Sequence, residues 1–440
     1  MKTVKQVRNS RVQPCEERPA RTEPLPWELP GAHWMGEEEL ALVGQVIRAR
    51  SPFRYYGLDL QRMADRLETA FGRRLGRKYA LGVNSATAGL HVALAALGIG
   101  PGDEVLLPGY LWVSCLSAIV RLGAIPRLVD IDRTFCMSPE DLRRKIGPHS
   151  KAVMLIHMSG APGRVDEIVR ICRRHKLALL EDCAQANGAA FHGRPVGSFG
   201  DLAVFSFQLN KNMSSGEGGM IVCDREELYK RCFAIHDLGY ARNAAGRLDV
   251  RDERYQLWGV GSRMSELTAA MALAQLKKLD RIVRAMRTAK WTIRKQLAEI
   301  SGLAFREILD PAGDSGPFLI TIYPHPDACR TFTQALRAEG IRGPEGSGVC
   351  LAMEEFGLHW YFNNPSLVNR RGLTPNGWPW TDPANVFAKD YGYGRGTLPV
   401  CDDLASRSAL LTIASCLTRQ DIRDIVKAFR KVARRVLGGG

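Results

Sequence analysis

One lysine lies in a polar turn between two apolar runs. Leu202 to Phe207 predicts a buried strand, Lys211 follows it, and Gly216-Glu217-Gly218-Gly219 leads into the next apolar run. A buried ammonium group is costly unless it is paired or loses its charge, and forming a Schiff base with a carbonyl cofactor is one way to lose it. The alternative is a solvated loop lysine, which is the commoner fate of this residue type.

Small and hydroxyl-bearing residues follow another apolar run, Tyr79 to Val83. The segment from Asn84 to Gly89 contains Thr87 and opens a predicted helix. Backbone N–H groups at a helix N-terminus attract anions, so this segment is a candidate phosphate cradle. An ordinary helix cap is the alternative, because Ser and Thr are common cap residues.

Further candidates lie at or near the ends of apolar runs. Asp182 ends the run from Ala178, and a buried carboxylate at this place would suit a cationic pyridinium nitrogen, although it would also suit a helix cap. Trp112 could stack on an aromatic ring, with packing in the core as the commoner alternative. Ser206 lies near the end of its strand, where its hydroxyl could reach a phosphate. His157 ends a strand too and could face the same site, although a lone histidine is more often structural.

The elements that position these residues alternate between strand and helix. Seven predicted strands cover 79–83, 104–107, 127–131, 153–157, 178–181, 202–207 and 220–223, and predicted helices cover 87–97, 113–122, 139–146 and 165–175. This alternation predicts a mainly parallel sheet, in which ligands bind at the carboxyl ends of the strands. A phosphate cradle, a stacking ring, a pyridinium partner and a Schiff-base lysine at that edge together fit pyridoxal phosphate.

The chain is predicted to have three parts. Residues 1–35 are polar and rich in Arg, Glu and Pro, which predicts a mobile arm. Residues 36–290 would form the large α/β domain with the seven-stranded sheet, which ends in a long helix over about 265–290. Residues 291–440 have fewer strand–helix units and predict a smaller α+β domain that ends in a helix over 418–436.

Composition excludes several other classes of protein. The net charge is +15, but the basic residues are scattered and no aromatic platform accompanies them, so nucleic acid is not an expected partner. The 11 cysteines form no Cys-x-x-Cys pair, which favours reduced thiols in the cytoplasm and no metal site. No apolar stretch is long enough to cross a membrane.

Several motifs together resemble the DegT/StrS sugar aminotransferase family of fold-type I pyridoxal-phosphate enzymes. They are Ser85-Ala86-Thr87-Ala88-Gly89-Leu90-His91, Glu181-Asp182-Cys183-Ala184-Gln185, Gly197-Ser198-Phe199-Gly200-Asp201, Phe205-Ser206-Phe207 and Lys211-Asn212 with Gly216-Glu217-Gly218-Gly219. The resemblance implies that Lys211 forms the Schiff base and is the catalytic acid and base. It also implies homodimers with sites at the subunit interface.

The same resemblance assigns the remaining site residues. It implies that Asp182 pairs with the pyridine nitrogen, that Gln185 lies near the ring hydroxyl and that Trp112 stacks on the ring. It implies that Ala86, Thr87 and Ser206 hold the phosphate. The family usually has Asn where this chain has Gly261, two residues before Arg263, and that Asn reaches the partner's cofactor phosphate.

Within the family, the chain looks closest to the branch of the 8-amino-3,8-dideoxy-octulosonate transaminase and the aminocyclitol enzymes. This similarity implies L-glutamate or L-glutamine as amino donor and a sugar-like, octulosonate or cyclitol acceptor, in cell-surface glycan or antibiotic biosynthesis. The loop 357–364 is the expected substrate-discriminating region. Elimination, dehydration or carbon–carbon bond formation at the same cofactor remain alternatives, as does a non-catalytic regulator. Sugar dehydratases of the family replace the lysine with histidine, whereas Lys211 is present here.

Overall fold

The computed structural model describes residues 18–438, and residues 1–17 and 439–440 lie outside the described part. Its largest sheet has seven strands in the order β1-β9-β8-β5-β4-β2-β3. In sheet order the bounds are β1 Tyr79–Val83, β9 Gly219–Cys223, β8 Leu202–Ser206, β5 Ala178–Asp182, β4 Ser150–Ile156, β2 Glu104–Pro108 and β3 Ile125–Val129.

The strands β3, β2, β4, β5 and β8 pair in parallel with their neighbours, whereas β9 is antiparallel to both β8 and β1. The carboxyl ends of β1, β8, β5, β4 and β2 therefore meet at one edge, as the alternating sequence pattern predicts. The predicted mainly parallel seven-stranded sheet is confirmed, and the largest shift in a strand boundary, at β4, is three residues.

Helices cover both faces of this sheet, which explains why its strands are apolar on both sides. One face packs against α3 (Ala86–Ala96), α4 (Val113–Val120) and α7 (Glu226–His236). The other face packs against α5 (Pro139–Lys145) and α6 (Val165–His175) at one end and α2 (Met63–Leu75) and α8 (Glu266–Leu297) at the other. Neighbouring residues divide between the faces, as Leu179 and Leu180 of β5 do.

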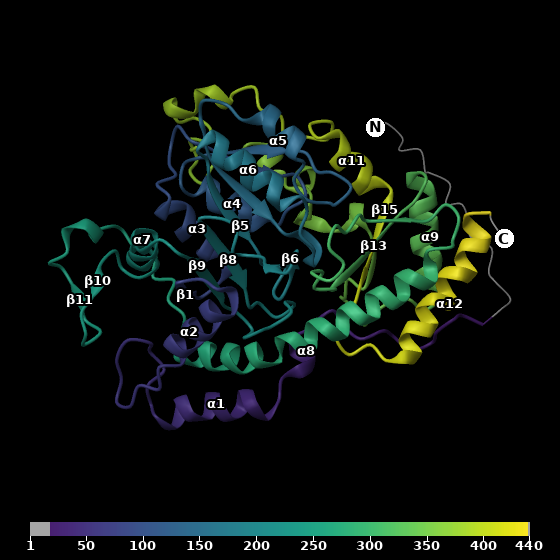
Figure 1. Ribbon diagram of the computed structural model, residues 1–440. Helices are drawn as coiled ribbons and strands as arrows, with labels where there is room; N and C mark the ends of the chain where they lie inside the picture. Colours follow the sequence, from purple (N-terminus) through teal and green to yellow (C-terminus); the bar gives the residue numbers. More distant parts are fainter. Residues whose placement is uncertain (1–17, 439–440) are drawn as a thin grey trace, which may run out of the picture.

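A second sheet follows the first along the chain. It is antiparallel, with strand order β12 (Ala304–Phe305), β13 (Phe318–Ile322), β15 (Ser408–Thr412) and β14 (Cys350–Ala352). The helices α9 (Pro326–Ala338) and α12 (Arg419–Val436) cover it (Figure 1).

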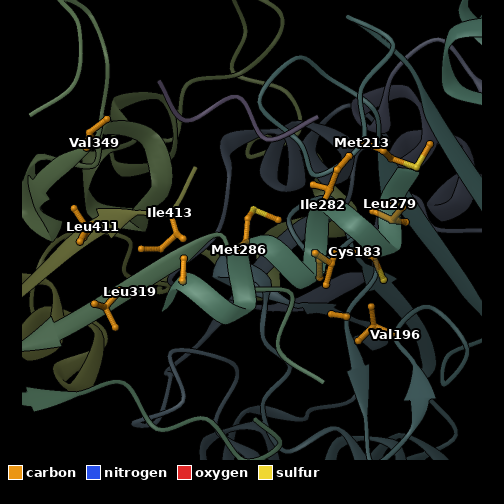
Figure 2. Packing of buried hydrophobic residues seen from close by; sticks show 14 of the residues in the cluster. Cys183, Val196, Met213, Leu279, Ile282, Met286, Leu319, Val349, Leu411 and Ile413 are labelled. Carbon is orange, nitrogen blue, oxygen red and sulfur yellow. The ribbon is translucent and has the colours of Figure 1, made fainter. Parts of the chain in front are cut away.

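The helix α8 runs from one sheet to the other (Figure 1). It continues past the predicted end near residue 290, because Ile293 and Leu297 extend its buried side. In Figure 2, Ile282 and Met286 of this helix lie between Cys183, which follows β5 of the large sheet, and Leu319 of the small sheet. One continuous apolar core thus joins the two parts of the chain.

The predicted N-terminal arm falls partly outside the described residues. Residues 18–35 run over the body of the protein: Leu25 is buried and its N–H donates to the Arg342 carbonyl at 2.8 Å, and the Gly31 N–H donates to the Lys211 carbonyl at 3.1 Å. The helix α1 (Glu37–Arg48) then packs against α8. The remaining elements are β6 Ala190–Phe191, β7 Arg194–Pro195, β10 Ala241–Arg242, β11 Leu248–Asp249, α10 Pro365–Val368, α11 Pro399–Ser406, and short 3-10 turns at Ala32–Trp34, Met158–Gly160, Glu253–Tyr255, Met353–Glu355, Gly357–His359, Tyr361–Asn363 and Pro383–Ala388.

Within residues 18–438, no helix is long and apolar enough to span a membrane.

Candidate active site

A cavity of about 310 Å³ opens at the carboxyl edge of the large sheet. The residues that the sequence points to come from the ends of three strands, β2, β5 and β8, and from the start of α3. All of them line this one cavity: Ala86, Thr87, Trp112, Asp182, Gln185, Ser206 and Lys211. The topology therefore brings together side chains that are separated by up to 125 residues, from Ala86 to Lys211.

Lys211 is held in the turn after β8. Its N–H donates to the Gln208 carbonyl at 3.0 Å, and its own carbonyl accepts the Gly31 N–H, so its main chain is fixed from two sides. Burial lowers the pKa of the Lys211 ammonium group, and the nearby carboxylates of Asp182 and Glu217 offset only part of this effect. A lysine of this kind reaches its neutral, nucleophilic form more easily than a solvated one.

Asp182 is 4% exposed at the end of β5. Its Oδ1 accepts the Ala184 N–H at 2.9 Å, and its Oδ2 accepts the Cys115 S–H at 3.1 Å. Burial raises the pKa of this carboxyl, against hydrogen bonds from Ala184 and Cys115 and the charge of Lys211. Burial also raises the pKa of the Cys115 thiol, which keeps it a donor. A carboxylate has about four lone-pair sites, so a cationic N–H in the cavity would find an acceptor here.

The N-terminus of α3 forms one wall of the cavity. Ser85 caps the helix, with its Oγ accepting the Ala88 N–H at 3.2 Å, and the Thr87 hydroxyl shares a hydrogen bond of 2.8 Å with Ser114. An added Cβ at Gly89 would come within 2.9 Å of Val204 in β8, so the missing side chain allows the helix start to lie close to the sheet. The first amide groups of this 11-residue helix can therefore bind an anion.

Trp112 is 42% exposed. It therefore does not pack in the core, which is the commoner alternative to stacking on an aromatic ring. Its ring centroid lies 4.7 Å from that of His359 with an interplanar angle of 43°. Burial lowers the pKa of His359 to about 4, so the imidazole is neutral at pH 7. Its Nδ1 lies 2.9 Å from the Phe356 carbonyl and must donate to it, which leaves Nε2 as an acceptor.

Gln185 and Ser206 complete the cavity wall. The Gln185 Oε1 accepts the Ser159 N–H at 2.9 Å, which leaves the side-chain NH₂ free to donate. The Ser206 hydroxyl is nearly buried and accepts the Gln208 N–H at 3.3 Å. Both side chains are oriented by backbone groups, as precise binding of a ligand requires.

His157 does not act as a wall of the cavity, although its position at the end of β4 allowed that reading. It is fully buried, and its Nε2 lies 2.9 Å from Glu181. Glu181 also accepts the N–H groups of Gly197, Phe199 and Gly200. Its two oxygens thus hold the segment after β7 in place by hydrogen bonds. We therefore interpret the buried group of His157, Glu181 and Cys183 as structural.

Gly261 has a φ of +64°, in the left-handed region that Gly adopts readily and Asn adopts more often than most other residues. An added Cβ would meet no atom within 4 Å. Arg263, two residues further along the chain, forms an ion pair with the buried Asp237. Hydrogen bonds from Arg242 and Arg263 lower the pKa of Asp237 despite its burial.

Sequence reasoning missed several residues of the cavity wall. Ser114 and Gln208 each lie within two or three residues of a residue that the sequence did identify. Glu217 lies in the quoted glycine-rich motif, and His359 lies in the loop expected to discriminate substrates. The complete set of missed wall residues is Ser85, Leu90, Ser114, Ile156, Met158, Ala184, Gln208, Asn210, Glu217 and His359.

The donor set fits pyridoxal phosphate. Hydroxyl groups and helix amides at one side suit the phosphate, the Trp112 indole offers a face for the ring, and the buried Asp182 carboxylate suits a protonated ring nitrogen. Lys211 supplies an amine of lowered pKa for the aldehyde. These are the residues that would hold the cofactor.

Comparisons with known proteins agree with this chemistry. The model of the DegT/DnrJ/EryC1/StrS aminotransferase family matches residues 37–344. The aminotransferase TlmJ from Streptoalloteichus hindustanus is 26% identical with a TM-score of 0.73, covering 92% of this chain and 98% of its own. S. venezuelae DesV, solved with a ketimine intermediate, is 25% identical with a TM-score of 0.73, covering 91% and 95%. The 3-amino-5-hydroxybenzoic acid synthase, at 23% identity and a TM-score of 0.74, covers 95% and 100% and shares the fold.

Proposed function

The chain belongs to the DegT/DnrJ/EryC1/StrS aminotransferase family, and on this premise we propose that it moves an amino group from L-glutamate or L-glutamine to a keto or aldehyde group of a sugar-like acceptor. It is a pyridoxal-phosphate-dependent aminotransferase. The observation that carries the proposal is the single cavity in which Lys211, with its lowered pKa, meets a buried carboxylate, a helix N-terminus and an exposed indole.

The bound cofactor supplies an aldehyde for the Schiff base and a ring that accepts electrons. With the cofactor bound, the Lys211 amine would hold its aldehyde, and it would act as general base and acid for the proton that leaves the α-carbon of the donor. Asp182 would accept the N–H of the pyridine ring and so would keep that nitrogen protonated. Trp112 would orient the ring, Gln185 would donate toward the ring hydroxyl, and Ala86, Thr87 and Ser206 would bind the phosphate.

The acceptor is proposed to be a carbohydrate or cyclitol in cell-surface glycan or antibiotic biosynthesis. Support comes from the resemblance to the branch of the 8-amino-3,8-dideoxy-octulosonate transaminase. DesI, a fold neighbour at 24% identity, was solved with its TDP-sugar product, and PseC from Helicobacter pylori is involved in the biosynthesis of pseudoaminic acid. The loop 357–364, which places His359 at the cavity, is the part of this chain proposed to select the acceptor.

We also propose that the enzyme works as a homodimer. The segment between α7 and α8, with β10 and β11, stands out from the body (Figure 1). It carries exposed apolar side chains, of which Trp258 is 95% exposed, and the others are Leu238, Leu248, Val250 and Val260. Large exposed apolar side chains gathered on one projecting segment support an interface between proteins at this place.

The domain limits follow the two sheets. We propose a large cofactor-binding domain over 36–290 and a small domain over 291–440, because every strand of the seven-stranded sheet precedes residue 290 and every strand of the four-stranded sheet follows it.

The test is the absorption spectrum of the purified protein with pyridoxal phosphate, before and after L-glutamate is added, together with an assay of 2-oxoglutarate. The proposal predicts a visible band from the lysine-bound cofactor that is replaced by the spectrum of pyridoxamine phosphate as 2-oxoglutarate appears. L-glutamine is tested in the same way. If the band forms and neither donor changes it, a non-transaminating reaction replaces the proposal.

A further inference from the structure

A second cavity of about 100 Å³ adjoins the candidate active site. The two cavities share wall residues Gln185, Asn210, Lys211 and His359, so the second lies directly beside the reactive amine. At about 100 Å³ this space is smaller than the first cavity, and it has room for a few polar groups such as hydroxyl groups. It suits one end of a molecule whose reacting carbon lies in the larger cavity.

The walls of the second cavity are largely apolar. Pro30 comes from the N-terminal segment, Phe356 from the loop before His359, and Pro317, Phe318 and Ile413 from the small sheet and its flanks. Against this background one carboxylate stands out, because Glu28 also lines the cavity. Apolar walls strengthen the interactions of a charged group that faces them.

The two oxygens of Glu28 are in different situations. Its Oε1 accepts the Gly348 N–H at 2.7 Å, which fixes the side chain to the small domain. Its Oε2 is buried and has no hydrogen-bond partner among the described residues. A buried carboxylate oxygen without a donor is costly, so a group that supplies O–H or N–H at this position would be bound strongly.

We propose that this second cavity, with Glu28 as the specificity-determining residue, binds the hydroxyl-bearing end of the acceptor. This inference rests on the proposed function and narrows its substrate class. The Glu28 Oε2 accepts a hydrogen bond from a hydroxyl group, while His359 Nε2 and the Gln185 amide offer further polar contacts at the opening. Its negative charge repels carboxylate and phosphate groups, so an anionic end of the acceptor points away from Glu28.

The test uses the half-reaction in which the pyridoxal-phosphate form of the full chain accepts an amino group from an amine. Probes are a set of monoamino sugars and monoamino inositols, with cyclohexylamine as a ring without hydroxyl groups and L-glutamate as an anionic donor. Rates are followed as loss of the visible band in the wild type, Glu28→Ala and Glu28→Gln. Glu23→Ala is the matched control, because Glu23 is an exposed carboxylate in the same segment.

We expect the wild type to prefer at least one amino sugar or inositol over cyclohexylamine. Glu28→Ala should lower that preference at least ~10-fold, the size expected for losing a hydrogen bond to a charged group. Glu28→Gln keeps an acceptor for Gly348 but removes the charge, so its rate with L-glutamate relative to the sugars should rise. Glu23→Ala should keep the wild-type ratios.

Two results would overturn the subsite. The first is that Glu28→Ala and Glu28→Gln both keep the wild-type preference for the hydroxylated amines over cyclohexylamine. The second is that the wild type converts L-glutamate but shows no preference for any hydroxylated amine. If Glu28→Ala slows all probes equally, Glu28 is only structural. A wild type that binds the cofactor but reacts with no amine at all contradicts the proposed function itself, and the subsite with it.

Discussion

The indole ring of Trp112 and the imidazole ring of His359 lie 4.7 Å apart at the mouth of the candidate active site. They come from the two parts of the chain, one following β2 and the other following β14. Two backbone hydrogen bonds hold their loops together, from the Leu111 N–H to the His359 carbonyl at 2.9 Å and from the Tyr361 N–H to the Gly109 carbonyl at 3.0 Å. The position of His359 over the site is therefore fixed by the loop that follows β2 of the large sheet.

Replacing Trp112 should weaken cofactor binding. Trp112→Ala removes the stacking face, and an aromatic pair contributes about 0.5–1.5 kcal/mol beyond its buried area, so the Kd for pyridoxal phosphate should rise roughly 2- to 12-fold. Trp112→Phe retains a ring and should stay close to the wild type. The Kd is measured by titrating apo-protein with the cofactor. Equal affinities in all three proteins would show that the indole does not stack on the ring.

The pH dependence of cofactor capture should report the pKa of Lys211. Only the neutral amine attacks the aldehyde, so the capture rate rises with pH and levels off above the pKa. Burial places that pKa below the ordinary value for lysine, whereas the Asp182 carboxylate acts to raise it. Asp182→Asn removes the negative charge, and the inflection should move to lower pH.

Glu217→Gln is the matched control for this experiment. Glu217 also raises the pKa of Lys211, so its loss should move the inflection in the same direction. Asp182→Asn should in addition weaken the protonation of the ring nitrogen and slow the half-reaction with L-glutamate. Capture rates from stopped-flow absorbance give the inflection, and a shift to higher pH in Asp182→Asn would contradict the assignment.

Removing the Lys211 amine should abolish transamination while leaving the fold intact. Lys211→Ala should lower the rate of 2-oxoglutarate formation by at least ~10²-fold, the lower end of the contribution of a general acid or base. Lys211→Arg keeps a positive charge and should be equally inactive. Circular dichroism and thermal unfolding check the fold. Wild-type rates in either variant would remove Lys211 from the mechanism.

The exposed segment between α7 and α8 should be needed for assembly. Trp258→Glu places a charge on its most exposed apolar residue and should shift the protein toward monomers in size-exclusion chromatography with light scattering. Arg251→Glu, on an exposed residue of the same segment, tests whether any added negative charge has this effect. A Trp258→Glu protein with the wild-type mass would place the interface elsewhere.

Much of the site follows from the sequence because the residues concerned come directly after buried strands. Asp182, Ser206 and Lys211 follow or end strands of one sheet, and the carboxyl ends of parallel strands meet at one edge by topology alone. The local sequence pattern is enough to place these residues, because the apolar runs before them clearly predict strands. The same pattern predicts the mainly parallel sheet and the helices α3, α4, α5, α6 and α8 that pack on it.

Glu28 and His359 could not be placed in this way. Both lie outside long periodic elements, and only tertiary contacts, such as the hydrogen bond from Gly348 to Glu28, bring them to Lys211. The packing of residues 18–35 has a similar origin, since a polar, proline-rich composition does not reveal that Leu25 is buried. Contacts between segments far apart in the chain leave no local signal.

The most direct test of the central claim is to trap the lysine-bound cofactor. The protein is loaded with pyridoxal phosphate, reduced with borohydride and digested, and mass spectrometry locates the phosphopyridoxyl group. The structure predicts that the group is found on the peptide that contains Lys211. A group attached to another lysine, for example to Lys290, which is buried and paired with Asp314 at 2.6 Å, would contradict the site described for this chain.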